Sequence, residues 1–70
     1  MTDGEALKAA IKRSGLSITF IAKEMDCSRG RIYAIIAGAD CTASEIATLT
    51  RLLRLTAEQR DYIFLRQTVN

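Results

Sequence analysis

The sequence contains no proline, no histidine and no tryptophan, and its four glycines occur singly. Because proline and glycine are the main residues of turns and helix ends, their scarcity leaves few turn signals. Helix-forming residues are plentiful, and the composition therefore favours an all-α protein. Its 70 residues correspond to one small domain, residues 1–70, with a small core.

The absence of histidine removes a side chain that often serves as a general base or a metal ligand. Cys27 and Cys41 have the spacing of neither a zinc ribbon nor a redox pair, and we expect two reduced thiols that do not pair with each other. No glycine-rich loop is present that would cradle a phosphate group. The sequence therefore predicts no catalytic residue, no metal site, no cofactor and no enzyme activity.

Long hydrophobic runs are also missing. The longest apolar run, residues 32–37, is far too short to span a membrane. The first five residues are acidic and polar, unlike a secretory signal. We therefore expect a cytoplasmic protein without a membrane partner.

Charge is modest and unevenly distributed. The net charge is +2, and residues 1–34 carry six basic and four acidic side chains, whereas residues 35–70 carry four of each sign. The surplus of positive charge therefore lies in the first half of the chain. This is a mild bias toward a polyanionic partner.

Residues 17–38 predict two short helices joined by a tight turn. Ser17 and Ser28 are N-cap residues, whose hydroxyl groups accept hydrogen bonds from the amides of the next turn. Gly38 provides the left-handed residue after the second helix. Apolar residues recur at helical spacing after each cap: Ile18, Ile21, Ala22 and Met25, then Ile32, Ile35 and Ile36. Two helices so closely joined form a helix-turn-helix, whose second helix can lie in the major groove of DNA.

The rest of the chain predicts three more helices. Thr42 with Glu45, and Thr56 with Gln59, have the spacing of capping boxes. The five expected helices cover about residues 4–14, 18–25, 29–37, 42–54 and 57–67. Their apolar anchors outside the helix-turn-helix are Leu7, Ile11, Ile46, Leu49, Leu53, Tyr62, Ile63 and Leu65. Five short helices with short loops predict one compact bundle.

This arrangement resembles the lambda-repressor and Cro type of helix-turn-helix, the XRE-like family of phage and bacterial regulators. The residues that carry the resemblance are Leu16, Ser17, Ile21, Ala22, Met25, Ser28, Ile32, Gly38, Leu49, Leu53, Leu55 and Thr56. The resemblance covers roughly residues 5–65. It implies a five-helix fold that binds DNA as a two-fold dimer, with the third helix in the major groove of each half-site.

The resemblance also implies site residues. The base-facing positions are Arg29, Gly30, Tyr33 and Ala34, and the positions near phosphate are Ser17, Ile18, Thr19, Ser28 and Arg31. Three positions depart from the family pattern: Ile18 and Phe20 stand where polar residues are common, and Asp26 stands where glycine is usual. Gly30 is compatible with a close approach either of DNA or of the preceding helix. Arg31 is a phosphate contact, or it is solvated or paired with Glu24.

Helix 5 and the tail, residues 57–70, carry more apolar residues than one core-facing side requires. The candidate dimer contacts are Tyr62, Phe64, Leu65 and Val69.

The predicted function is a sequence-specific DNA-binding transcription regulator, a small repressor of phage or mobile-element type that acts as a homodimer on a palindromic operator. The alternative is a protein-interaction module, antirepressor-like or antitoxin-like, that presents an apolar surface of Ile18, Phe20 and Ala34 to another protein.

Overall fold

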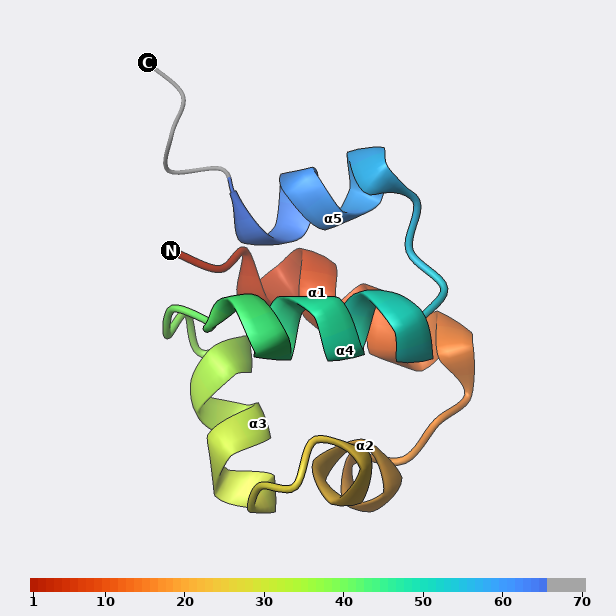
Figure 1. Ribbon diagram of the computed structural model, residues 1–70, viewed down its shortest axis with the longest axis vertical. Coiled ribbons are helices and arrows are strands. Elements are labelled where there is room, and N and C mark those ends of the chain that lie inside the picture. The colour runs from red at the N-terminus through yellow and green to blue at the C-terminus, as the bar shows by residue number, and fades with distance from the viewer. Residues whose placement is uncertain (66–70) are drawn as a thin grey trace.

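The computed structural model describes residues 1–65, which form five α-helices and no strand. The helices are α1 (Gly4–Ser14), α2 (Ile18–Glu24), α3 (Arg29–Ile36), α4 (Ala43–Leu52) and α5 (Ala57–Phe64). Figure 1 shows α1 in the middle of the bundle, with α5 on one side of it and α2 and α3 on the other. The all-α class and the five-helix architecture predicted from the sequence are confirmed.

Every helix begins at a side chain that caps its first turn. Ser17 and Ser28 accept hydrogen bonds from the amides three residues further on, as the sequence predicts. Both predicted capping boxes are reciprocal, with Glu45 and Gln59 accepting from the amides of Thr42 and Thr56. The boundaries of α1 to α4 therefore agree with the sequence to within one or two residues.

Left-handed backbone conformations follow four of the helices. Gly15 and Gly38 have φ angles of 76° and 114°, and Asp26 has a φ angle of 55°. Of these positions, Gly38 and Asp26 were anticipated, and glycine and aspartate tolerate this region best. Arg54 also adopts it, with φ of 54°, two residues after the end of α4. Nothing in the sequence predicts this position.

The core lies where all five helices meet. Its fully buried side chains are Leu7, Ile21, Ile32, Ile35 and Leu49. Helix α1 packs against α3 and α5, and α2 packs against α3 and α4. The apolar spacing in α1 to α4 therefore identified the core-facing side of each helix correctly.

Helix α5 differs from its prediction. It ends at Phe64, and residues 66–70 lie outside the described part of the chain. Ile63 and Phe64 are its buried residues, whereas Tyr62 and Leu65 are exposed. Positions 60, 63 and 64 are spaced i, i+3 and i+4, so this stripe faces α1 and turns Tyr62 and Leu65 away from the core. The assignment of Tyr62 and Leu65 as core anchors is wrong.

Residues 2–4 contact the bundle through hydrogen bonds and close packing, which the spacing of apolar residues in the sequence does not predict. Thr2 is buried, and its hydroxyl donates to the carbonyl of Ala39 at 2.8 Å. The Asp3 amide donates to the carbonyl of Ile63 at 2.7 Å. A Cβ atom at Gly4 would overlap the carbonyl oxygen of Ile36, so glycine is required there. Within residues 1–65, no helix has both the length and the apolar character needed to cross a membrane.

Candidate nucleic-acid interface

Helices α2 and α3 are joined by four residues and cross steeply. In Figure 1, α2 is seen almost end-on, while α3 runs from top to bottom at the lower left. The turn closes where the Cys27 amide donates to the carbonyl of Ala22 at 2.9 Å, and Asp26 supplies the left-handed residue. This tight turn fixes the orientation of α3 relative to α2 and leaves one side of α3 outside the bundle.

The exposed side of α3 contains all four residues predicted to face bases. Ile32 and Ile35 lie in the core, and the opposite side of the helix consists of Arg29, Gly30, Tyr33 and Ala34. The Tyr33 side chain is 57% exposed. These residues are spaced i, i+1, i+4 and i+5, so they form one continuous strip along the helix. The strip contains no acidic residue.

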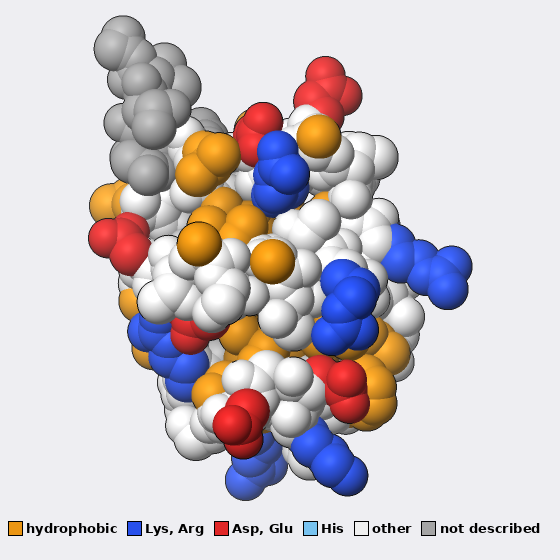
Figure 2. All heavy atoms as spheres, in the orientation of Figure 1, with side chains coloured by type: hydrophobic (Ala, Val, Ile, Leu, Met, Phe, Trp, Pro, Cys, Tyr) orange, Lys and Arg blue, Asp and Glu red, His pale blue; other side chains and the backbone are white. Residues whose placement is uncertain are grey.

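Arg29 lies at the first position of α3 and is exposed. Within residues 1–65 its side chain has no ion pair and no hydrogen bond with the protein. The helix dipole disfavours a cation at this end, so the fold gains nothing evident from Arg29. Figure 2 shows Lys and Arg side chains projecting from the lower end of the molecule, where Figure 1 places α2 and α3.

Gly30 has open space beside it. A Cβ atom at this position would meet only the Ser28 hydroxyl oxygen, at 3.6 Å, which is ordinary contact. Helix α2 therefore does not require glycine here, and the reading in which a close approach of α2 explains Gly30 is wrong. Packing within the protein therefore does not explain why position 30 of the exposed strip is a glycine.

Arg31 forms a tertiary link instead of projecting freely. Its Nε and Nη2 groups donate to the two carboxylate oxygens of Glu45 at 2.9 Å and 2.8 Å, and Nη2 also donates to the carbonyl of Asp40 at 2.9 Å. These bonds lower the pKa of Glu45 to about 2 and raise the pKa of Arg31. The partner is therefore Glu45 on α4 and not Glu24. Only the Nη1 group of Arg31 can still donate to a phosphate. The negative charge of Glu45 already balances the positive charge of the Arg31 guanidinium.

The remaining phosphate candidates cluster at the starts of α2 and α3. Ser17, Thr19 and Ser28 are exposed. The Ser17 and Ser28 hydroxyl oxygens accept from the amides of Phe20 and Arg31, and their hydroxyl hydrogens can still donate. Ile18 is half-buried against the core. Only its backbone amide can therefore serve a phosphate.

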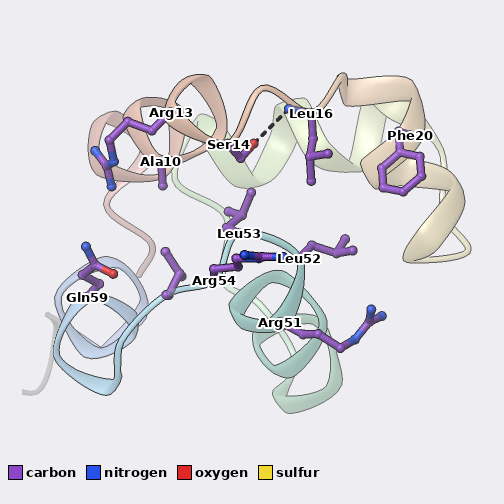
Figure 3. A pocket seen from close by; sticks show the side chains of 11 residues that line it. Ala10, Arg13, Ser14, Leu16, Phe20, Arg51, Leu52, Leu53, Arg54 and Gln59 are labelled. Carbon is purple, nitrogen blue, oxygen red and sulfur yellow. Dashed lines mark hydrogen bonds between the residues drawn. The ribbon is translucent and has the colours of Figure 1, made fainter.

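The apolar surface expected beside this interface is smaller than predicted. Ile18 and Ile36 both pack against the core, whereas Phe20 is 43% exposed. Phe20 lies on a groove lined by no α3 residue (Figure 3). The predicted surface of Ile18, Phe20 and Ala34 is therefore not one continuous apolar patch.

The two cysteines were expected to be thiols that do not pair with each other. Cys27 and Cys41 are free, half-buried thiols. Burial raises the pKa of each thiol, so the nucleophilic thiolate is disfavoured. In the described part of the chain, no three Cys, Asp or Glu side chains come together in a way that would hold a metal ion.

The candidate dimer surface also needs a correction. Phe64 is only 4% exposed and belongs to the core, so it is unavailable to a second subunit. Tyr62 and Leu65 are 56% and 39% exposed. Val69 lies outside the described residues. Tyr62 and Leu65 therefore remain as candidate dimer contacts.

Comparisons of this chain with protein-family models, with curated proteins and with solved structures found no match. The arrangement of α2 and α3 therefore carries the functional argument.

Proposed function

We propose that this chain is a sequence-specific DNA-binding regulator of transcription that acts as a homodimer, with α3 lying in the major groove. The observation that carries the proposal is the exposed strip of Arg29, Gly30, Tyr33 and Ala34, which has no acidic residue and begins with an arginine unpaired within residues 1–65. A single helix fits the width of the major groove.

The chemistry of the strip suits base edges. An arginine fork at Arg29 can donate two hydrogen bonds to O6 and N7 of guanine, the commonest specific contact in protein–DNA complexes. The Tyr33 ring can pack on a sugar or on a thymine methyl group. Gly30 and Ala34 have little or no side chain, so they let the helix backbone approach the groove closely. Ala34 also offers a methyl group to thymine.

The flanking hydroxyl groups suit the phosphate backbone. Ser17, Thr19 and Ser28 lie exposed at the starts of α2 and α3. Hydroxyl and amide groups commonly donate to phosphate oxygens, and such contacts fix the orientation of the protein on the duplex. We place the Ile18 backbone amide in the same set. Arg31 contributes mainly by holding α3 against α4.

A dimer would place two copies of α3 on one face of the duplex. In this proposal, Tyr62 and Leu65 form the self-contact, and the half-sites lie about 34 Å apart on a palindromic operator. A bound dimer would block polymerase at an overlapping promoter, which makes the chain a small repressor. The phage or mobile-element type follows from the family resemblance alone.

One observation favours a second candidate function, that of a protein-interaction module of the antirepressor or antitoxin kind. Phe20 is a large exposed apolar side chain, and the α3 strip has only two residues, Arg29 and Tyr33, with polar side-chain atoms. A protein partner could pack an apolar side chain directly against the Phe20 ring. Duplex DNA offers it little apart from thymine methyl groups.

Salt dependence distinguishes the two functions. Duplexes are selected from a random library on the purified protein, and the binding of the best duplex is measured by fluorescence anisotropy over a range of salt concentrations. The DNA-binding proposal expects log K to fall linearly with log salt, by about 0.9 for each phosphate contacted. Lys8→Ala, which removes one positive charge from α1, is the charge-matched control for variants in α3. Failure to enrich any duplex sequence would exclude sequence-specific DNA binding.

A further inference from the structure

A groove on the opposite side of the molecule from α3 has no role in the proposed DNA contact. It encloses about 630 Å³ between the end of α1, Phe20 of α2 and the turn that joins α4 to α5. In Figure 1 this turn lies on the right, whereas α3 lies on the left. No residue from 21 to 50 lines the groove.

The groove combines three arginines with an apolar floor. Arg13, Arg51 and Arg54 line it, and no aspartate or glutamate does. Within residues 1–65 these three side chains have no ion pair with the protein. Figure 3 shows Arg13 and Gln59 at one end and Phe20 at the other, with Leu16 and Leu52 between them. The lining therefore attracts negative charge at its rim and apolar groups at its floor.

Arg54 has a backbone conformation that its residue type does not favour. Its φ angle is 54°, in the left-handed region that glycine adopts at far lower cost. Its amide and that of Leu55 close the end of α4, donating to the carbonyls of Arg51 and Thr50, and glycine would make the same bonds. An arginine thus occupies a position where glycine would serve the fold better, and its side chain lines the groove (Figure 3). Such strain points to a use outside the fold.

We propose that this groove binds an acidic segment of a partner protein, one in which aspartate or glutamate residues flank an apolar side chain. The carboxylates would pair with Arg13, Arg51 and Arg54. The apolar side chain would pack on Phe20 and the leucine floor.

Charge complementarity and shape select this occupant. Duplex DNA has phosphates for the arginines, but its thymine methyl groups and sugar carbons cannot reach the leucine floor, because a rod of its diameter cannot enter the groove. Small-molecule sites are mostly apolar and bury most of the ligand. This groove is open to solvent and is rimmed by long, flexible arginine side chains. An extended or helical peptide meets both the charged rim and the apolar floor.

The proposal is independent of DNA binding by α3. Because the groove shares no lining residue with the exposed strip of α3, a peptide in the groove leaves Arg29 and Tyr33 uncovered. Loss of DNA binding would therefore leave the groove proposal intact, and the reverse also holds.

The probe is a random peptide library displayed on phage and selected on the purified wild-type chain. The selected peptide is then titrated into isotope-labelled protein, and the binding site is mapped from backbone amide shifts. We expect selected peptides that combine acidic and apolar residues, with shifts at residues 13–16, 20 and 51–59. Replacing the acidic residues of the peptide by their amides should abolish binding.

Variants test the residues without endangering the fold. Arg54→Gly relieves the strained backbone, so we expect equal or greater thermal stability together with about fivefold weaker peptide binding. Phe20→Ala should weaken binding by a similar factor, and Lys8→Ala, outside the groove, should leave it unchanged. Selection of no peptide, selection of peptides without acidic residues, or shifts confined to α3 would each overturn the proposal. Groove shifts produced more strongly by random duplex DNA or by ATP would assign the groove to a nucleic acid or a nucleotide instead.

Discussion

The Arg31 guanidinium of α3 and the Glu45 carboxylate of α4 form a two-point ion pair, with both N–O distances below 3 Å. Glu45 is at the same time the third residue of α4 and completes the capping box of this helix, where it accepts from the Thr42 amide at 2.8 Å. One carboxylate therefore both begins α4 and fixes the position of α3. The orientation of the exposed α3 strip depends on this pair.

Glu45→Gln should destabilise the protein at neutral pH by about 1–2 kcal/mol, because it removes the charge-assisted bonds but keeps an acceptor for the Thr42 amide. Gln59 shows that glutamine serves a capping box in this same chain. The pair lowers the pKa of Glu45 from 4.5 to about 2. Its stabilisation is therefore complete above about pH 4.5 and is lost as the pH falls toward 2.

Urea unfolding at a series of pH values checks this prediction. The difference between wild type and Glu45→Gln should shrink as the pH falls through this window. Glu58→Gln, which changes an exposed carboxylate in the first turn of α5, is the matched control. A difference that stays constant down to the lowest pH would show that the ion pair does not contribute.

Gly30→Ala should stabilise α3 and weaken DNA binding. The new methyl group meets only the Ser28 hydroxyl oxygen, and alanine is favoured over glycine inside a helix by roughly 0.5–1 kcal/mol. On the DNA side, the same methyl group would hinder close approach of the helix backbone to the groove. Thermal melting and anisotropy on the selected duplex measure the two effects separately.

The contrasting variant is Gly4→Ala, whose methyl group would overlap the Ile36 carbonyl and should unfold the chain. If Gly30→Ala raised stability and left DNA binding unchanged, Gly30 would not lie against the duplex.

The sequence predicted the helices well because their signals are local. Capping side chains such as Ser17 and Thr42, and the left-handed residues Gly15 and Asp26, determine helix ends within one turn of chain. Apolar spacing then identified which side of α3 faces the core. The family resemblance grouped the four residues of the exposed strip, and they lie opposite the core-facing side that the spacing identified.

Tertiary pairing could not be predicted in the same way. Arg31 and Glu45 are 14 residues apart, and no periodicity links them, so the sequence offered Glu24 as a partner instead. In α5, Tyr62, Ile63, Phe64 and Leu65 form an apolar run, which does not indicate which side faces α1. The buried Thr2 and the groove around Arg54 likewise depend on segments distant in the chain.

Tyr62→Ala and Leu65→Ala should weaken self-association while leaving the monomer folded, because both side chains are exposed. Phe64→Ala should behave differently. Its ring is buried in the core, so truncation should cost about 3–5 kcal/mol and unfold much of the protein. Sedimentation equilibrium, together with circular dichroism, separates the two classes. Unchanged self-association in both surface variants would place the dimer contact elsewhere.

Arg29→Ala and Arg31→Ala should affect DNA binding for different reasons. Arg29 has no ion pair within residues 1–65, and in the proposed complex it reads guanine, so its loss should cost about 1–3 kcal/mol on the selected duplex and much less on random DNA. Arg31 holds α3 against α4, so its loss should lower the melting temperature and weaken binding to both duplexes similarly.

Salt titrations of both variants on the two duplexes complete this test, under conditions in which each variant is folded. Because Glu45 already matches the charge of Arg31, the salt slope of Arg31→Ala should remain close to that of wild type. A slope lower by about one would instead show that Nη1 of Arg31 contacts a phosphate. If Arg29→Ala bound both duplexes as wild type does, α3 would not be the reading helix, and the protein-interaction function would become the better account of the exposed Phe20.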